Sequence, residues 1–456
     1  MSLMRETVLR NIDHAYDQYL LSHEKDAVQA VTSFEDRLQK SHIKYGKFSI
    51  PTFCKPHFLN PRQEKLVKST SETIMSILNK VVDLHFREPS FADLCHLSDE
   101  AKELVSLDHG YSRNVVIARF DALMEGESLK FVELNTSSPA GMNYADQIED
   151  MIFSTEELTG FFEGHHFKRE HRSEKLLAAL LGAYEEFGGP EKPHIAIVDW
   201  RTVKTRPEFE SLKTFFDSKG YKTEIVDPRD FRYKGGKLYY EDFRVDLVYR
   251  RVMVEEIFEK LDEVSDFIKA YKDRAICMVN PLRSKLAGTK AMMSLLTNPG
   301  YDRYFTVEEN RVKTHHLPWT RRMVDAEQFY GGRKIYLIDF LKDEKDTLVL
   351  KPSEGHNGKD VFIGSETREE DWNRVIDRAL KADWVVQEFV PIPVVTVPSV
   401  VNSRIDFLYK KINFNAFVFG AKYAGGFSRV SDESVINVAR NGGLMTSVTV
   451  EEVHER

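Results

Sequence analysis

The sequence has few cysteines, no long hydrophobic run and no excess of positive charge. Its three cysteines, Cys54, Cys95 and Cys277, are far apart and lack CxxC spacing, so neither a disulfide framework nor a zinc site is indicated. No apolar run approaches the length of a membrane span, and the first residues lack the apolar core of a signal peptide, so we expect no membrane partner and a cytoplasmic location. The net charge of −8 provides no basic field for nucleic acid.

What the chain does have is length and an ordinary globular composition. With 456 residues, of which 42% are hydrophobic and 30% charged, it is too long for one ordinary core and predicts about two or three domains. Residues 1–113 are predicted to be a helical region: apolar residues recur at helical spacing over residues 5–40, with a break near Ser22, and again from Pro61. Whether this helical N-terminal region only supports the rest of the chain or forms a homodimer interface is left open.

Strands with polar tips begin after the helical region. Residues 114–121 and 129–135 predict a β-hairpin, and Glu133 and Asn135 project from one face of its second strand because they are two positions apart. With Asp121 beside them, these side chains offer the oxygen ligands that Mg²⁺ prefers. The alternative is a solvent-facing polar stripe on a half-buried strand.

Hydroxyl and guanidinium groups follow in two places. Ser137 and Ser138 come directly after the second strand and could hold a carboxylate or a phosphate. Over residues 191–275 strands alternate with a helix, which predicts a small parallel-sheet domain. Ligands lie outside the carboxyl ends of strands in such sheets, so Arg250 and Arg251 at one strand end could grip a substrate carboxylate. The alternative is that at least one of the two arginines is simply on the surface.

The most informative stretch lies further along the chain. Residues 347–350 predict a buried strand that delivers Lys351 to a loop containing Gly355 and Gly358. The glycines allow the backbone to approach an anionic ligand closely, and the lysine offers a point charge for a phosphate. A second strand at residues 384–390 carries a Gln-Glu pair, and the two strands together indicate a nucleotide cleft. The alternative is a lysine in solvent beside a plain turn.

Several other segments have predicted conformations. Residues 317–322 are expected to form a loop, residues 325–330 a helix, and residues 405–408 and 414–420 two strands. The glycine-rich segment 423–444 is either a mobile loop that covers a substrate or a plain hairpin.

In their order along the chain, these motifs resemble the circularly permuted branch of the ATP-grasp superfamily, which includes eukaryotic-type glutathione synthetase and the synthetase half of glutathionylspermidine synthetase. The glutamate–asparagine pair precedes the lysines, as in that branch and unlike in ordinary ATP-grasp chains. The resemblance, which covers residues 114–443, rests on Arg119-Phe-Asp121, Glu133-Leu-Asn135, Leu286-Ala-Gly-Thr-Lys290, Val349-Leu-Lys351-Pro, Glu354-Gly-His-Asn-Gly358, Gln387-Glu-Phe-Val390, Gly426-Phe-Ser-Arg429 and Asn437-Val-Ala439.

The chain also departs from this family. Its loop after Lys351 has fewer glycines than the triple-glycine loop of eukaryotic glutathione synthetase. Beyond Arg250 and Arg251, no residue matches the groups that recognise cysteine and the γ-glutamyl unit in that enzyme. The sequence contains no cysteine amidase half of the kind found in the bifunctional glutathionylspermidine enzymes. The nucleotide side of the resemblance is therefore better supported than the substrate side.

The resemblance implies an α/β (α+β) chain with a permuted ATP-grasp fold, a small parallel-sheet substrate domain and a helical N-terminal region. With the patterns above it divides the chain into residues 1–113 (helical), 114–190 (metal-ligand strands and helices), 191–275 (substrate domain) and 276–456 (nucleotide-binding domain with a glycine-rich lid). The implied site residues are Arg119 and Arg429 for catalysis; Lys290, Lys351, Gly355, Asn357, Gly358, Gln387, Glu388 and Val390 for ATP; Asp121, Glu133, Asn135 and Glu354 for Mg²⁺; and Ser137, Ser138, Arg250, Arg251 and Asn437 for substrate.

The implied activity is an ATP- and Mg²⁺-dependent ligase that joins a carboxylate, which could be peptide-like, to an amine through an acylphosphate. Loops at residues 355–359 and 423–444 would close over the acylphosphate and exclude water. Two other classes stay open on the same motifs: a catalytically silent protein that binds a nucleotide or a protein partner, and a small-molecule kinase.

Overall fold

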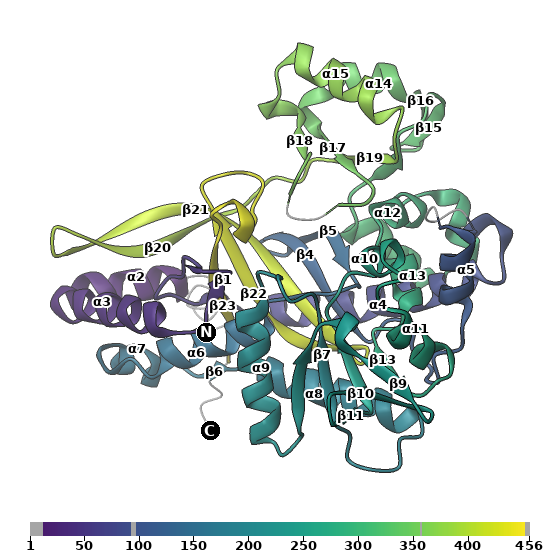
Figure 1. The fold of residues 1–456 in the computed structure, drawn as a ribbon. Helices are drawn as coiled ribbons and strands as arrows, with labels where there is room; N and C mark the ends of the chain where they lie inside the picture. Colours follow the sequence, from purple (N-terminus) through teal and green to yellow (C-terminus); the bar gives the residue numbers. More distant parts are fainter. Residues whose placement is uncertain (1–11, 93–96, 356–357, 452–456) are drawn as a thin grey trace.

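The computed structural model of the chain describes residues 12–92, 97–355 and 358–451. It confirms the predicted mixture of helix and sheet, with a large central sheet and two four-stranded sheets, one above and one below it in Figure 1. In this described part of the chain, no helix combines the length and the apolarity needed to cross a membrane.

The central sheet has the strand order β3-β23-β22-β21-β4-β5, with β20 paired to β21 and β6 paired to β23. Its strands are β3 (His57–Leu59), β4 (Ile117–Glu125), β5 (Ser128–Asn135), β6 (Phe167–Lys168), β20 (Val394–Val401), β21 (Arg404–Phe419), β22 (Lys422–Ser431) and β23 (Gly443–Val450). The predicted hairpin is confirmed as β4 and β5. Segment 423–444 is the hairpin of β22 and β23 with its connecting loop, as the second interpretation had it.

Strand β21 corrects one prediction. Residues 405–408 and 414–420 were expected to form two strands, but β21 runs continuously through the polar residues between them. Those residues stay in the strand because β20 and β22 pair with them through backbone hydrogen bonds. Polar side chains in the middle of a long strand therefore did not mark a strand end.

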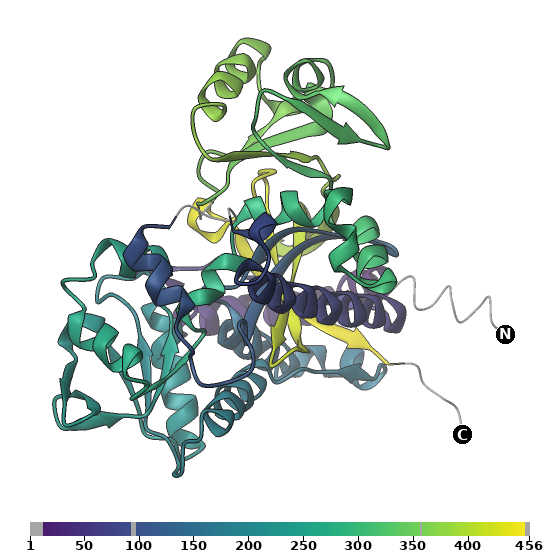
Figure 2. The ribbon, with the colours of Figure 1, turned by 90° about the vertical axis from the view of Figure 1, so that its right-hand side faces the viewer.

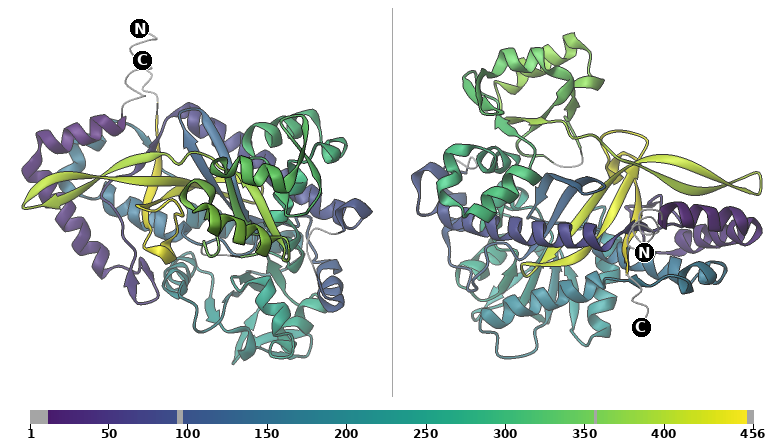
Figure 3. Two further views of the ribbon diagram at one scale, coloured as in Figure 1. Left: turned by 90° about the horizontal axis from the view of Figure 1, so that it is seen from above. Right: turned by 180° about the vertical axis from the view of Figure 1, so that it is seen from behind.

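Different helices cover the two faces of the central sheet. Because successive side chains of a strand point to opposite faces, each strand contributes to both cores. On β4, Ala118 and Phe120 belong to the core shared with α4, whereas Ile117 belongs to the core shared with α6 and α8. Arg119 and Asp121 follow the alternation of Ile117 and share its face. The right-hand view of Figure 3 shows α4 running across the sheet. The helices involved are α4 (Pro61–His85), α6 (Met142–Phe153) and α8 (Arg172–Glu186).

The N-terminal helices confirm the predicted break. They are α2 (Ile12–Ser22) and α3 (Glu24–Lys40), and the next helix, α4, begins at Pro61 as expected. Asn60 and Gln63 form a capping box at the start of α4, in which each side chain accepts a hydrogen bond from the other residue's backbone N–H. Shorter elements of the same half are β1 (Lys44–Tyr45), β2 (Phe48–Ser49), α5 (Asp99–Ser106) and α7 (Thr159–Glu163).

The lower sheet is the predicted parallel sheet. Its order is β13-β12-β7-β8 and every pair is parallel, although β13 lies just beyond the predicted boundary at residue 275. The chain reverses direction across the sheet between β7 and β12, the position where such sheets bind ligands. Its strands and neighbours are β7 (Ile195–Val198), β8 (Thr223–Val226), β12 (Leu247–Arg250), β13 (Cys277–Val279), α9 (Arg206–Ser218), α10 (Val254–Glu259), α11 (Ser265–Lys272) and the antiparallel β9 (Arg232–Lys234), β10 (Lys237–Tyr240) and β11 (Phe243–Val245).

The third sheet, called the outer sheet below, is antiparallel with the order β14-β19-β17-β18. Figure 2 shows this sheet above the rest of the molecule, with helices on the side of the sheet that faces away from the rest of the molecule. Its core contains Leu350, Trp372 and Val386. The elements are β14 (Thr320–Arg322), β17 (Leu348–Pro352), β18 (Phe362–Ile363), β19 (Trp384–Glu388), α14 (Leu337–Asp343) and α15 (Glu369–Ala379), with α12 (Lys290–Leu296) and α13 (Val307–His316) below them.

Two predictions about the outer sheet were wrong. Residues 317–322 were expected to be a loop, but Thr320–Arg322 form β14, which is held by its pairing with β19. Residues 325–330 were expected to be a helix, but β15 (Glu327–Tyr330) pairs with β16 (Arg333–Tyr336). Gly331 and Gly332 connect these two strands with positive φ angles of 56° and 79°, a turn that favours a hairpin.

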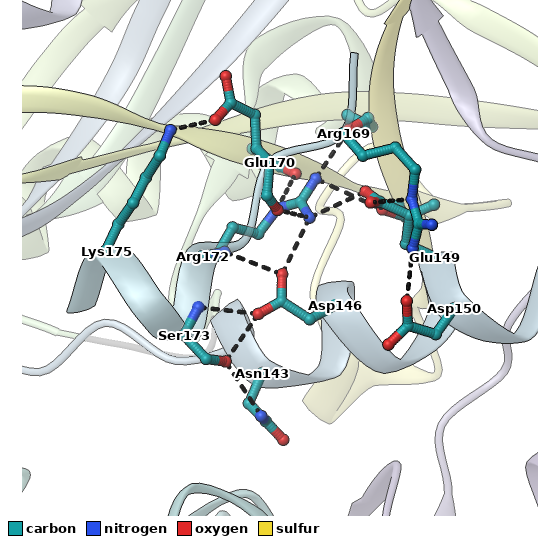
Figure 4. A network of polar contacts seen from close by, with 12 residues as sticks. Asn143, Asp146, Glu149, Asp150, Arg169, Glu170, Arg172, Ser173 and Lys175 are labelled. Carbon is teal, nitrogen blue, oxygen red and sulfur yellow. Dashed lines mark hydrogen bonds and ion pairs between the residues drawn. The ribbon is translucent and has the colours of Figure 1, made fainter. Parts of the chain in front are cut away.

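A buried ionic network attaches α6 and α8 to the central sheet (Figure 4). The guanidinium of Arg172 is fully buried and lies 3.1 Å from Asp146 and 3.0 Å from Glu149. It also donates to the carbonyl oxygens of Gly426 and Ser447, at 2.9 and 2.8 Å. The Arg172 side chain thus links α6 and α8 to β22 and β23. These helices lie on the face of the sheet that carries Arg119 and Asp121.

Candidate active site

A row of polar side chains lies on one face of the central sheet. In the register of β4 with β5, Arg119 is opposite Asn135 and Asp121 is opposite Glu133. Residues opposite each other in a sheet project from the same face, so all four side chains share it. Arg429 reaches the same group from β22, since its guanidinium contacts Asp121. The structure therefore brings together five residues that the sequence had predicted for catalysis and metal binding.

Asp121 holds two arginines at the centre of this row. Its carboxylate accepts from Arg119 Nε at 2.9 Å and from Arg429 Nη2 at 2.6 Å, and Asp121 is only 1% exposed. Burial lowers the pKa of Arg429, and the charge of Asp121 opposes this shift. Arg429 Nε also donates to the side chain of Asn413 at 3.3 Å. Both carboxylate oxygens of Asp121 are thus engaged with guanidinium groups, which gives it a positioning role; its role as a Mg²⁺ ligand stays a prediction.

Two lysines approach the row, Lys351 from β17 of the outer sheet and Lys290 from the start of α12. Lys290 Nζ lies 3.0 Å from Glu133 Oε1 and donates to the carbonyl oxygen of Gly355 at 2.9 Å. Lys351 Nζ donates to Gln387 Oε1 at 2.8 Å and to the carbonyl oxygen of Val132 on β5 at 3.1 Å. Residues from three distant stretches of the chain therefore meet between the outer and central sheets.

Lys351 differs from its prediction in one respect. It was expected at an exposed loop edge, but it is 7% exposed and belongs to β17. The expectation was wrong because β17 continues through Lys351 in its pairing with β19, and the Lys351 side chain reaches Gln387 and the carbonyl oxygen of Val132 on β5. Its substitution would therefore change packing as well as charge.

The charges in this cluster shift one another's pKa values. Burial raises the pKa of Glu133, but the charges of Lys290 and Lys351 outweigh burial and lower it to about 2. Burial, with the nearby charge of Lys290, lowers the pKa of Lys351 to about 8. Glu133 therefore stays a carboxylate at any working pH. Two cations facing one carboxylate leave a net positive charge, which suits a polyanionic ligand.

The Gln-Glu pair sits where β19 meets β14. Gln387 Nε2 donates to Thr320 Oγ1 at 3.0 Å, so the same amide connects Lys351 to β14. The backbone N–H of Glu388 donates to the carbonyl oxygen of Trp319 at 2.8 Å. Val390 follows the strand and is half-buried. These contacts hold the end of β19 in place. The family resemblance implies that adenine binds at this end of the strand.

The glycine loop after β17 contacts the loop between β22 and β23. A Cβ on Gly358 would come within 2.6 Å of Val435 Cγ1, and φ at Gly358 is +65°, so a glycine is required there. Arg440 Nη1 donates to the carbonyl oxygen of Gly358 at 3.3 Å. The same Cβ would lie 4.0 Å from Asn437 Cβ, and the side-chain oxygen of Asn437 accepts from the backbone N–H of Ala439 at 2.8 Å. Asn357, predicted for ATP, lies outside the described residues.

The residues predicted to bind Mg²⁺ do not form a complete coordination site. In the ranges that the structure describes, no group of three or more His, Cys, Asp or Glu side chains is arranged to hold an ion. Glu133 and Asn135 present a carboxylate and an amide on one face, and the Asn135 Nδ2 donor is buried without a hydrogen-bond partner among the described residues. Mg²⁺ usually takes only one or two protein carboxylates and completes its shell with phosphate and water. These two residues therefore fit an ion that arrives with a nucleotide.

The predicted substrate residues are largely bonded to one another. Arg250 is fully buried and donates to the carbonyl oxygens of Asn280 (2.9 Å) and Val252 (2.7 Å) and to Ser137 Oγ (3.3 Å). Burial lowers its pKa to about 10. Ser138 donates to the carbonyl oxygen of Arg251. In this structure Arg250 positions the segment after β5, and a direct role in substrate binding stays a prediction.

Arg251 is more open to a ligand role. It is 3% exposed, and its Nη1 is engaged by the hydroxyl of Tyr249 at 3.0 Å and by the carbonyl oxygen of Pro139. Its buried Nε has no hydrogen-bond partner among the described residues. An unpaired buried donor costs free energy, so Arg251 is the member of the pair with a donor left for an acceptor.

Three residues that support the site were not selected from the sequence. Asn413 holds Arg429, Asn280 accepts from the backbone N–H groups of Val116 and Ile117 at 2.9 Å, and Glu208 accepts from that of Gly141 at 2.7 Å. The alternation Asn-Phe-Asn in an apolar strand was a usable signal for Asn413. Asn280 and Glu208 act on segments far away in the sequence, and no local pattern marks such residues.

Comparisons with known proteins bear on this fold. No protein-family model matches the chain, and no curated protein matches it. Among solved structures, the chain is similar to a glutathione synthetase-like effector from Globodera pallida in its apo form, with a TM-score of 0.59 and 12% sequence identity over 92% of this chain and 96% of that chain. A protein from Methylobacillus flagellatus provisionally named gamma-glutamylcysteine synthetase matches over 86% of this chain and 89% of its own, at 13% identity and a TM-score of 0.42. The first match shows that this chain has a glutathione synthetase-like fold.

Proposed function

We propose that this protein is an ATP- and Mg²⁺-dependent ligase of the circularly permuted ATP-grasp type, which joins a carboxylate to an amine through an acylphosphate. The observation that carries the proposal is the approach of two lysines to the glutamate–asparagine strand. Lys290 lies 3.0 Å from Glu133, and Lys351 reaches the neighbouring carbonyl of Val132 at 3.1 Å. A pair of cations facing a metal-type oxygen pair is what a nucleotide triphosphate with its metal requires.

The nucleotide would lie between the outer and central sheets. Lys290 and Lys351 would bind its phosphates, and the backbone at Gly355 and Gly358 would lie beside them. Gln387, Glu388 and Val390 would line the adenine edge. Glu133 and Asn135, with Glu354 and Asp121 as further candidates, would hold Mg²⁺, which neutralises phosphate charge during transfer.

Two steps complete the reaction. A substrate carboxylate oxygen attacks the γ-phosphorus, the bond to the β,γ-bridging oxygen breaks and ADP leaves. The amine then attacks the acyl carbon, the acyl–oxygen bond breaks with release of phosphate, and the nitrogen loses a proton. Arg119 and Arg429, fixed by Asp121, would stabilise the charge that develops on the transferred group. Substrate would be oriented by Ser137, Ser138, Arg250, Arg251 and Asn437.

An assay with substrate pools tests this proposal. The protein is incubated with ATP, MgCl₂ and pools of amino acids and polyamines, and phosphate release and new masses are followed. We expect phosphate release only when a carboxylate and an amine are both present, together with a new amide. Bound ADP without turnover in any pool would instead favour a silent nucleotide-binding protein, and a phosphorylated product without an amide would favour a kinase.

Glu133→Gln is the matched inactive variant for this assay. The amide keeps the size of the side chain but removes the charge that faces Lys290, so we expect turnover to fall by at least about tenfold. Glu127→Gln is the control, because Glu127 lies in the turn of the same hairpin with its side chain 70% exposed. Equal turnover in the two variants would rule out a ligand role for Glu133.

Nucleotide affinity is expected to depend on pH through Lys351. Its pKa is lowered to about 8, and only the ammonium form attracts a phosphate. Affinity for ADP should therefore be constant below this pKa and fall by up to about tenfold per pH unit above it. Calorimetric titrations on both sides of the pKa measure this. A flat profile, or an equal decline in Lys351→Met, would show that another group controls binding.

A further inference from the structure

Lys285 lies between carboxylates from two different parts of the fold. Its Nζ is 2.6 Å from Glu255 Oε1 on α10 and 2.8 Å from Glu354 Oε1, two residues after the end of β17. The Lys285 side chain is 4% exposed, on the short helical segment Leu282–Ala287. The two partners outweigh the effect of burial and raise its pKa, so Lys285 is a buried cation. It joins the small parallel-sheet region to the first residue of the glycine loop.

The two partners are not equally fixed. Glu255 lies in the first turn of a helix, and its Oε2 is buried without a hydrogen-bond partner among the described residues. Glu354 is the more exposed of the two, at 43% against 33%, and precedes Gly355, whose φ is +149°. An exposed ion pair contributes little free energy, so the more exposed carboxylate loses less when it leaves the lysine. Glu354 is therefore the partner that can leave.

Moving Glu354 away from Lys285 costs little free energy, because the remaining charges still balance. Removing the only partner of a buried lysine would leave an uncompensated charge, which is strongly destabilising. Here Lys285 keeps Glu255 when Glu354 leaves, so one cation still faces one carboxylate. The carboxylate of Glu354 is therefore available to bind another cation nearby.

We propose that Lys285 is a positioning residue that holds Glu354 until a metal–nucleotide complex competes for it, with Glu255 as the partner that remains. This rests on the proposed function, in which Glu354 is a metal ligand. Lys285 then opposes metal binding, and Glu255 assists it by sharing Lys285. Mutating the two residues should consequently shift the Mg²⁺ dependence of nucleotide binding in opposite directions.

Titration of ADP at a series of MgCl₂ concentrations tests this without any need for turnover. In Lys285→Met, Glu354 has no competing cation, and half-maximal enhancement of ADP binding should need about threefold less Mg²⁺. In Glu255→Gln, Lys285 is left with Glu354 alone, and about threefold more Mg²⁺ should be needed. A role in packing alone would weaken binding in both variants, so the opposite signs identify the competition.

Lys313→Met is the matched control. Lys313 is also a buried lysine, with its side chain 2% exposed, paired at 3.0 Å with Asp302, whose side chain is 47% exposed, but it lies on α13. Its Mg²⁺ dependence should equal that of the wild type. If ADP binds but both test variants shift in one direction or neither shifts, the inference is overturned and the proposed function stands. If the wild type binds no ADP at any Mg²⁺ concentration, both are overturned.

Discussion

Replacing Lys351 with methionine is expected to weaken ADP binding by about 30-fold to 1000-fold, the range for removing one partner of a buried charged contact. Lys351 is one of two cations that face Glu133, and among the described residues its Nζ has Gln387 Oε1 and the backbone carbonyl of Val132 as its hydrogen-bond partners. No carboxylate of the described residues forms an ion pair with Lys351, so its charge is available to a phosphate.

The same substitution should leave the thermal unfolding temperature unchanged or raise it. Burial lowers the pKa of Lys351 to about 8, which means that the native state holds its charge at a cost. Methionine fills a similar volume without a charge, and replacing a buried charged group by an apolar one is often neutral or stabilising. Alanine would be a poor test, because at a position only 7% exposed it would leave a cavity.

Calorimetry with ADP and a thermal melt measure the two halves of this prediction, with Lys313→Met as the control for loss of a buried lysine elsewhere. Affinity equal to the wild type would show that the nucleotide does not meet Lys351. A variant that loses both its affinity and its fold would show that the lysine is structural.

Arg429→Met is expected to lower turnover by about 10²-fold to 10³-fold while ADP affinity changes little. Arg429 is held by Asp121 and Asn413. Its charge would act on the transferred phosphoryl group, and stabilisation of a developing charge appears in kcat and not in ground-state binding.

Asp121→Asn tests whether the arginines must be held in place. The amide keeps the shape but removes the charge that Arg119 and Arg429 share, so turnover should fall while both guanidinium groups remain. Arg37→Met, a partly buried arginine on α3, is the control and should keep full activity. Unchanged turnover in Arg429→Met would remove the arginines from the mechanism, and a parallel loss of ADP affinity would mark them as nucleotide ligands.

Local pattern was sufficient for much of this fold. The alternation predicted a hairpin with Glu133 and Asn135 on one face and Asp121 beside them. The register confirms this and adds Arg119 to the same face. Strand–helix alternation likewise predicted the parallel sheet, because its repeating unit is local in sequence.

Features that depend on distant partners were missed. Residues Thr320–Arg322 are a strand only because β19 pairs with them, and the polar middle of β21 is extended only because β20 and β22 flank it. The burial of Lys351 and the internal bonding of Arg250 likewise depend on tertiary neighbours. A sequence can mark such residues as chemically suited to a ligand, but cannot show that the protein itself satisfies them.

Transfer of an oxygen atom tests the proposed chemistry most directly. Substrate carboxylates labelled with ¹⁸O are supplied with ATP, MgCl₂ and the amine pool, and the released phosphate and the new products are analysed by mass spectrometry. An acylphosphate requires that the oxygen which attacked the γ-phosphorus leaves with the phosphate. We therefore predict one ¹⁸O atom in phosphate for each amide formed, and amide formation with unlabelled phosphate, or ATP consumption with no amide, would contradict the assignment.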